Sequence, residues 1–422
     1  MKRNVIVLFA TASLFFLMAS CRGQTLDRQA TFEMVWNKVN GTFFDTTFGG
    51  LDWNNAHDRY LPRTTAAGSD DEFYRLVNTM LWELNVSHAN LIPPGLLARR
   101  KPLVCAEGSP GIDIRMIYGL AVVTSVRPGS PAENQGLRRG YVIEVVDGIP
   151  VERIVHEAEK VMRPPKNSHH RVALVTKEIL GRIYGVPGTE VSIAYSDEGG
   201  IKHETRMARV KRTGRAVGPS GVLYLAVDLE ARRLDNGIGY IRLNTFQPPL
   251  VAQVSNEIRS LGTITGIIFD LRGNAGGEIE GMPELFLRER ALLYLSRSRK
   301  GITQVVAEPA AVAFKGPLVL LVDQLSGSAG ELFACCLQAI GRAVVVGERT
   351  PGAIMESDMT VLSNGAILMV PVAQLSTPDG TVLEGHGVVP TIEVGLDRDK
   401  LLNGIDSQLE AARSYLEKDA LK

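Results

Sequence analysis

The stretch "VDQLSGSAGELFACC", residues 322–336, decides the fold of the chain around it. An apolar run, 318–322, stops at a cluster of small residues, and a run that favours a helix begins near Ala329. A strand, a tight turn and a helix, with a serine in the turn, is how α/β enzymes raise a nucleophile above a sheet. Ser328 occupies that turn. The alternative is a Gly/Ser turn in which Ser326 or Ser328 only caps the helix.

Strands and helices alternate around this stretch, from about residue 215 to the end of the chain. We predict strands at "GIGYIRLNTF", "ITGIIFDLRGNAGG" and "AVVVGERTPG", and helices at "PLVAQVSNEIRSLG" and "MPELFLRERALL". Continuous apolar strands with helical crossovers indicate an α/β layered domain with parallel strand pairs. The backbone N–H of Ala329, together with that of Gly276 or Gly277, would form an oxyanion hole at the helix N-terminus.

The segment from residue 26 to 100 is predicted to be helical. "SDDEFYRLVNTMLWELN" opens with a capping box, Ser69 to Glu72, and continues with apolar residues at helical spacing. This helix should end near Asn85. Ser87 and His88 are therefore expected on the loop just after a helix end.

From about residue 103 short apolar runs alternate with Gly, Pro and Asp-Gly turns, which is typical of a small β domain. "PGIDIRMIYGLAVVTSVRPGSPAENQGLRRGYVIEVVDGIPV" resembles a PDZ domain of the bacterial-protease type, over residues 103–211. The resemblance implies capture of an extended peptide, often by its C-terminal carboxylate. The loop expected to bind it consists of Gly111, Ile112, Asp113 and Ile114. "RPPKNSHHRVALVTK" interrupts the pattern, and we predict an inserted loop there with His169 and His170 in solvent.

The N-terminus, "MKRNVIVLFATASLFFLMASC", has a basic start, a short apolar run and small residues before Cys21. The run is too short to span a bilayer, so residues 1–20 are predicted to be a secretory signal. Cys21 resembles the lipidated cysteine of a bacterial lipoprotein, with ordinary secretion as the alternative. Arg22 follows where an Asp would retain a lipoprotein in the inner membrane. We therefore expect a lipid-anchored protein of the bacterial cell envelope that faces the periplasm, with the outer membrane preferred.

The charge balance and the cysteine spacing argue against a nucleic-acid-binding protein and against a cysteine metal site. The 422 residues carry 46 basic and 46 acidic side chains, so no net field favours nucleic acid as a partner. Cys105, Cys335 and Cys336 have no metal-ligand spacing, and we expect all three to be buried structural residues. Neither a metal nor a cofactor is expected. The sequence leaves the oligomeric state open.

The motifs "GYIRLNTF", "DLRGNAGG", "SGSAGELFACCLQAIGRAVVVGERTPG" and "TPDGTVLEGHGVVPTIEV" occur in this order after the PDZ-like domain. The series resembles the C-terminal processing peptidase family and its relative, the tricorn protease core. This implies a ClpP/crotonase-like layered core, with Ser328 of "S-x-x-E" as nucleophile and Glu331 as its glutamate. The processing peptidases use a lysine base 25 residues after the serine, where this chain has Ala353. Lys315 cannot replace that lysine, because the intervening strand puts it about 20 Å from Ser328.

The tricorn-like branch places a Ser-His pair before the PDZ domain and a glutamate late in the core. Ser87, His88 and Glu384 match these positions, which implies that His88 accepts the Ser328 proton and passes it to the leaving amine. Glu384, with the Ser87 hydroxyl, would fix the imidazole and stabilise its cation. His386 is the rival base, although glycines on both sides of it predict a mobile loop.

The sequence thus predicts an α+β multidomain protein with a signal peptide (1–20), a helical domain (21–102), a PDZ-like domain (103–211) and a peptidase core (215–422). We expect an envelope-anchored serine endopeptidase that cleaves peptides or unfolded protein ends through an acyl-enzyme. Its contact with the membrane would be through the lipid anchor only. The main alternative is a catalytically degenerate peptide-binding adaptor, which Ala353 favours. A third possibility, an unrelated hydrolase of small esters, is disfavoured by the PDZ-like insertion.

Overall fold

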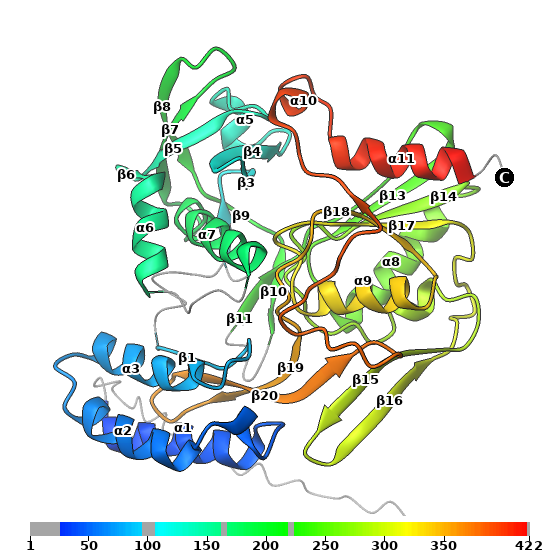
Figure 1. The fold of residues 1–422 in the computed structure, drawn as a ribbon. Helices are drawn as coiled ribbons and strands as arrows, with labels where there is room; N and C mark the ends of the chain where they lie inside the picture. Colours follow the sequence, from blue (N-terminus) through cyan, green and yellow to red (C-terminus); the bar gives the residue numbers. More distant parts are fainter. Residues whose placement is uncertain (1–25, 95–105, 162–166, 218–222, 420–422) are drawn as a thin grey trace, which may run out of the picture.

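The computed structural model describes residues 26–94, 106–161, 167–217 and 223–419. The predicted signal peptide, Cys21 and Cys105 lie outside these residues. A helical N-terminal unit, a PDZ-like unit and an α/β core can be distinguished in Figure 1. Within the described ranges, every helix is too short or too polar to cross a bilayer.

The core is built on a mixed sheet whose described strands run in the order β12-β13-β14-β17-β18-β21. All neighbouring pairs are parallel except β12 with β13. The strands are β12 (Leu229–Arg233), β13 (Ile238–Leu243), β14 (Gly266–Asp270), β17 (Leu318–Val322), β18 (Val344–Gly347) and β21 (Ile392–Glu393). Every residue of β14 and β17 is buried, as expected for parallel strands covered on both faces.

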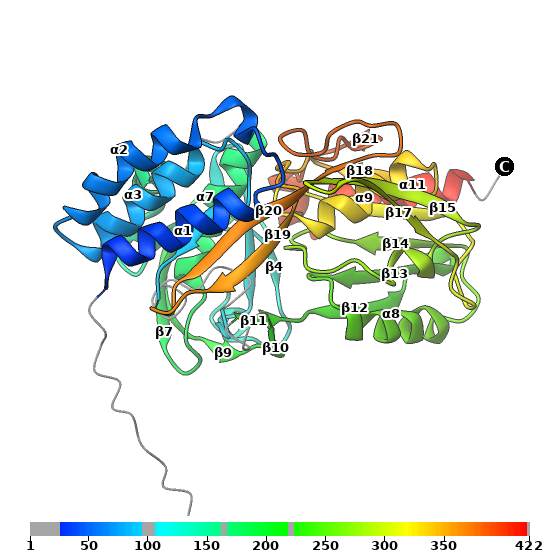
Figure 2. The ribbon, with the colours of Figure 1, turned by 90° about the horizontal axis from the view of Figure 1, so that it is seen from below.

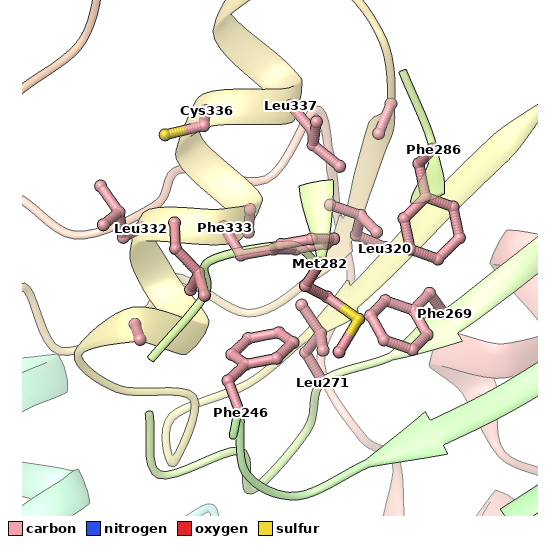
Figure 3. Packing of buried hydrophobic residues seen from close by; sticks show 14 of the residues in the cluster. Phe246, Phe269, Leu271, Met282, Phe286, Leu320, Leu332, Phe333, Cys336 and Leu337 are labelled. Carbon is pink, nitrogen blue, oxygen red and sulfur yellow. The ribbon is translucent and has the colours of Figure 1, made fainter. Parts of the chain in front are cut away.

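Helices cover both faces of this sheet (Figure 1). Helices α8 (Pro248–Ser260) and α9 (Ala329–Ala339) pack on one face, and α11 (Ser407–Asp419) packs on the other. Figure 3 shows the ring of Phe333 on α9 among Phe246, Phe269 and Phe286, all with no exposed surface. The first turn of α9 is therefore fixed from beneath by a dense aromatic cluster.

The N-terminal unit consists of α1 (Arg28–Thr42), α2 (Trp53–Thr65) and α3 (Asp70–Trp82). The predicted cap is present, because the Ser69 hydroxyl accepts the Glu72 N–H at 3.2 Å. After α3 the chain forms a short strand, β1 (Asn90–Ile92), which pairs antiparallel with β20 (Ile367–Ser376) of the core.

Apolar residues of α1, α2 and α3 form one cluster with residues of β20 and of β19 (Met355–Val361). Figure 2 shows α1 beside β20. β20 also pairs with β15 (Ala291–Ser298), which forms a hairpin with β16 (Gly301–Ala307). The N-terminal unit and the core therefore share one sheet and one apolar cluster, although residues far apart in the sequence build them.

The PDZ-like unit is a sheet in the order β3-β4-β5-β7-β8, with β6 beside β5. Its elements are β3 (Ile112–Ile117), β4 (Leu120–Val126), α5 (Pro131–Asn134), β5 (Val142–Val146), β6 (Ile149–Pro150), α6 (Val151–Val161), α7 (Ser168–Ile183), β7 (Glu190–Ser196) and β8 (Lys202–Ala208). Short pairs link it to the core, namely β2 (Gly108–Ser109) with β9 (Val210–Lys211) and β10 (Gly214–Val217) with β11 (Leu223–Ala226). A small helix, α10 (Arg398–Leu402), precedes α11.

The prediction of an inserted loop over residues 163–177 is wrong for the described part of that segment. α7 begins at Ser168, where the Asn167 side chain accepts the His170 N–H at 2.7 Å. Thr176, Ile179 and Leu180 recur at helical spacing and are buried. His169 and His170 are half-buried rather than solvated.

The helix predicted at "MPELFLRERALL" is also absent. A single 3₁₀ turn, Pro283–Leu285, is followed by a loop and then by β15. Tertiary packing overrides the local helical preference here, because β15 pairs with β16 and β20 on its two edges.

Candidate active site

The predicted nucleophile turn lies between β17 and α9, with Ser328 directly before the helix. Its backbone has φ 53° and ψ −122°, a region that residues other than glycine rarely adopt. The Ser328 N–H is held by the Glu331 carboxylate at 3.0 Å and faces the Ala353 carbonyl at 3.2 Å. The structure therefore maintains a strained backbone at this one serine.

His88 lies on the loop after α3, and its Nε2 is 3.3 Å from the Ser328 Oγ. Its Nδ1 is 2.7 Å from the Ser87 Oγ. The Glu384 carboxylate accepts the Ser87 hydroxyl at 2.8 Å and the Ser87 N–H at 2.6 Å. The structure thus brings together all four residues that the sequence singled out, in the order Ser328, His88, Ser87, Glu384.

The Ser87 hydroxyl determines which nitrogen of His88 carries the proton. Glu384 also accepts the Ile354 N–H at 2.9 Å, so donors surround it as they would an ionised carboxylate. The Ser87 hydroxyl has one proton and donates it to Glu384, and its oxygen then accepts Nδ1–H of His88. The lone pair of Nε2 is left facing the Ser328 hydroxyl, which is the arrangement a general base needs.

The environment of His88 favours the neutral imidazole. Burial lowers the pKa of His88, the Lys177 ammonium lowers it further, and the Glu384 carboxylate opposes both effects. A neutral base is therefore available at neutral pH, and Glu384 can stabilise the imidazolium once a proton arrives.

Two glycine loops form the other side of the site. The Gly276 N–H donates to Asn274 Oδ1 at 2.9 Å, whereas within the described structure the Gly277 N–H makes no hydrogen bond. Ala329 is the first residue of α9, so its N–H has no acceptor within the helix. Of the two glycines considered from the sequence, Gly277 is thus the one free to donate beside Ala329 to an oxyanion.

Gly276 has to be a glycine for a second reason. A Cβ added there would lie 2.7 Å from the Ser328 Cβ and 3.0 Å from the Ala329 N. Its φ of 101° also lies in the region that side chains avoid. Any side chain at this position would occupy the space in front of the Ala329 N–H.

Comparison with known proteins agrees with this geometry. The family model for peptidase family S41 matches residues 237–394, the tricorn protease C1 domain matches 25–82, and a PDZ domain matches 122–176. Residues 237–394 therefore form a peptidase family S41 domain.

Proteins with this domain are similar to the chain over most of its length. The carboxyl-terminal-processing protease of Synechocystis is 29% identical and the match covers 86% of this chain and 80% of the relative. Tricorn protease homolog 1 of Streptomyces coelicolor is 24% identical over 92% of this chain and 35% of its own. The solved photosystem II D1 C-terminal processing protease shares the fold, with a TM-score of 0.57, 24% identity and coverage of 90% and 97% of the two chains.

In this chain Ala353 occupies the position of the lysine base that the processing peptidases use, and it lies beside Ser328. The Ala353 N–H and carbonyl contact Glu331 and Ser328, and its methyl group cannot accept a proton. Glu331 also accepts from the Thr350 hydroxyl and the Gly352 N–H. Burial raises the pKa of Glu331 to about 7 despite these hydrogen bonds.

Within the described structure, neither of the other candidate bases makes a hydrogen bond to Ser328. His386 is exposed, and its carbonyl accepts the Arg349 side chain at 3.0 Å. Lys315 is exposed just before β17, whereas Ser328 follows the other end of that strand. Cys335 and Cys336 are buried free thiols, as expected. In the described ranges no three His, Cys, Asp or Glu side chains gather into a metal site.

The predicted peptide-binding loop borders a cavity of about 1090 Å³ between the PDZ domain and the core. Gly111, Ile112 and Asp113 line this cavity. The Gly111 N–H donates to the Ser109 Oγ at 3.0 Å, and the Asp113 carboxylate pairs with Arg115 at 2.9 Å. The loop is present, but an internal partner already holds its first N–H group.

The free edge of β3, where a peptide would add as a further strand, is capped by side chains. The Ile112 and Ile114 carbonyls accept the Tyr184 hydroxyl (2.8 Å) and Arg115 Nη1 (2.7 Å). Farther along, the Gln324 carboxamide bonds both the N–H and the carbonyl of Met116, at 3.3 and 3.2 Å. Gln324 belongs to the nucleophile loop, so the core itself occupies the edge of the PDZ sheet.

Lys177, a charged residue near the nucleophile, was not predicted from the sequence. A Cβ added at Gly327 would lie 4.0 Å from the Lys177 Nζ. Lys177 is carried by α7, the helix that was interpreted as a loop. The helical spacing of Ala173, Thr176 and Leu180 was the signal that could have placed it against the core.

Proposed function

We propose that this chain is an envelope-anchored serine endopeptidase that cleaves peptides or the C-terminal regions of proteins, with its PDZ domain capturing the substrate. The hydrogen-bonded series from Ser328 through His88 and Ser87 to Glu384 carries this proposal. Each of its members has the acid–base character that acyl transfer requires.

In the proposed reaction, Ser328 Oγ attacks the scissile carbonyl carbon while His88 Nε2 takes its proton. The N–H groups of Ala329 and Gly277 stabilise the oxyanion. His88 then gives the proton to the leaving amine, the C–N bond breaks, and the acyl group stays on Ser328 as an ester. Water attacks the ester with His88 as base, which releases the acid and restores the serine hydroxyl.

A serine-reactive fluorophosphonate tests the chemistry directly. We expect one adduct on Ser328 by mass spectrometry, no adduct in Ser328→Ala, and a much slower reaction in His88→Ala. His386→Ala is the matched control and should label like the parent. A parent chain that neither labels nor hydrolyses any peptide would favour the adaptor function instead.

The envelope location is proposed from the N-terminal sequence. Residues 1–20 would be removed as a signal, and Cys21 would carry the lipid that holds the protein at the outer membrane, facing the periplasm. A Cys21→Ser variant should move to the soluble envelope fraction. Membrane attachment that is unchanged in this variant would contradict the anchor.

A further inference from the structure

Helix α7 of the PDZ domain is attached to three loops that carry active-site residues. The Thr176 hydroxyl donates to Gln324 Oε1 at 3.1 Å, and Gln324 lies in the nucleophile loop. The Asn167 side chain donates to the Pro351 and Gly385 carbonyls at 3.3 and 3.1 Å. The Leu325 side chain is buried in the apolar cluster of the PDZ domain. These contacts fix the side chains of α7 relative to Ser328.

Lys177 is the residue of α7 that this docking presents to the nucleophile. Its Nζ lies 4.0 Å from where a Cβ on Gly327 would be, and Gly327 directly precedes Ser328. The side chain is half-buried, in keeping with a position at the wall of a cleft. In the described structure the ammonium has neither an ion pair nor a hydrogen bond.

The two acidic groups that act electrostatically on Lys177, Glu331 and Asp323, already have other hydrogen-bond or ion-pair partners. Asp323 pairs with Arg115 at 2.5 Å and accepts the Gly273 N–H at 3.0 Å. Glu331 accepts hydrogen bonds from a hydroxyl and from three backbone N–H groups. Burial lowers the pKa of Lys177, while Glu331 and Asp323 act to raise it. The site thus contains a partly desolvated cation with no anion in contact, which is a costly state to maintain.

We propose that Lys177 is a specificity-determining residue that binds a carboxylate of the substrate next to the scissile bond. This inference rests on the proposed peptidase function. A peptide whose carbonyl reaches Ser328 has to pass Gly327, and a carboxylate on it would meet the ammonium in a site from which water is largely displaced. The carboxylate is either an Asp or Glu side chain or the C-terminal α-carboxylate, since both offer the same oxygens.

Lys177 does not act as the base in this proposal. His88 Nε2 is within 3.3 Å of the Ser328 Oγ, whereas Lys177 makes no hydrogen bond to that oxygen. Its contribution is therefore to substrate binding, and it should appear in KM more than in kcat.

The test uses the full chain and one cleavable peptide made in matched forms. Glu is replaced by Gln or Lys at each position flanking the cleaved bond, and the C-terminus is free or amidated. The parent should prefer the form with a carboxylate near the bond by roughly tenfold to a hundredfold in kcat/KM, the effect of one charge-assisted hydrogen bond. The Glu/Gln pairs and the free/amidated pair separate the two sources of carboxylate.

Variants of Lys177 then assign the effect. Lys177→Met keeps the length of the side chain and should abolish the preference, Lys177→Arg should retain it, and Lys177→Glu should favour the Lys peptide. Lys202→Met is the control, because Lys202 is exposed at the PDZ surface and pairs with Glu144. It should leave the preference unchanged.

Four outcomes would overturn the proposal. A parent that cleaves all forms equally lacks the specificity, although the peptidase function stands. A preference that survives in Lys177→Met belongs to another residue. If Lys177→Met and Lys177→Arg both fold normally but cleave none of the peptides, Lys177 takes part in catalysis rather than in substrate selection. Absence of both labelling and cleavage in the parent would remove the proposed function itself.

Discussion

The Ser87 hydroxyl lies between the Glu384 carboxylate and the His88 imidazole and contacts both. Glu384 accepts both the hydroxyl and the N–H of Ser87, and that hydroxyl contacts His88 Nδ1 at 2.7 Å. The orienting role predicted from the sequence was mainly that of Glu384. In the structure Ser87 is the residue that touches the base.

Ser87→Ala should therefore lower kcat/KM by about 10- to 100-fold, the usual effect of removing a partner that orients a functional histidine. Glu384→Gln should weaken the same hydrogen-bonded series that holds His88. The kcat/KM of the double variant should therefore be only slightly lower than that of the less active single variant. Ser87→Thr keeps a hydroxyl and should restore much of the activity. Full additivity of the two single changes would show that Ser87 and Glu384 act independently.

Ser328→Ala and His88→Ala should each remove most turnover, on the order of 10³-fold or more, with little additivity between them. The reason is that the nucleophile and its base act as one unit. Steady-state hydrolysis of a peptide measures this, and His386→Ala should match the parent. Activity retained in His88→Ala but lost in His386→Ala would reverse the assignment of the base.

The pH profile should show one group that must be deprotonated. Burial lowers the pKa of His88. The apparent pKa of the acid limb of the kcat/KM profile should therefore be lower than the ordinary histidine value of about 6.5. Activity rises with pH through that limb, since only the neutral imidazole accepts the Ser328 proton. Rates measured from acid to neutral pH check this, and a limb well above the ordinary value would argue against His88.

Gly276→Ala should lower kcat by about 10² to 10³, the effect of losing one oxyanion donor. The added methyl group would crowd Ser328 and block the Ala329 N–H. Gly119→Ala is a matched control, because Gly119 also has a positive φ, 81°, but open space around it. If both variants lose the same activity, backbone strain rather than the oxyanion site explains the result.

Gln324→Ala should strengthen peptide binding by the PDZ domain, because a peptide strand and Gln324 compete for the N–H and carbonyl of Met116. Binding of a labelled peptide to full-length Ser328→Ala, with and without the second change, measures the effect. Gln338→Ala is the control, since that amide bonds the Val389 carbonyl and the Thr391 hydroxyl instead. Unchanged affinity in the double variant would mean that peptides do not add to β3.

The core and the nucleophile turn could be predicted from local sequence patterns. Apolar strands, the helix after Ser328 and the cap at Ser69 each depend on neighbouring residues, and the structure contains all of them. The placement of His88 and Glu384 was predicted only through family resemblance, because their approach depends on the pairing of segments far apart in the chain.

The errors have the same origin. "ELFLRERALL" has helix-forming residues, but its last three residues begin the strand β15, which pairs with β16 and β20. Asn167 and the spacing of the apolar residues after it did signal α7, but the two histidines suggested a solvated loop. Lys177 was missed with that helix, and no pattern within the sequence indicates that its side chain lies next to Gly327.

The pairing of β1 with β20 also determines when in its synthesis the protein can become active. His88 precedes β1 and is made early, whereas β20 and Glu384 are made late. A strand as short as Asn90–Ile92 has no independent stability, so it has to wait for the core strand that it joins. A nascent or truncated chain that ends before β20 therefore has a histidine and a serine but no means of holding them together. The active site can therefore be assembled only after the chain has been synthesised past β20 and Glu384.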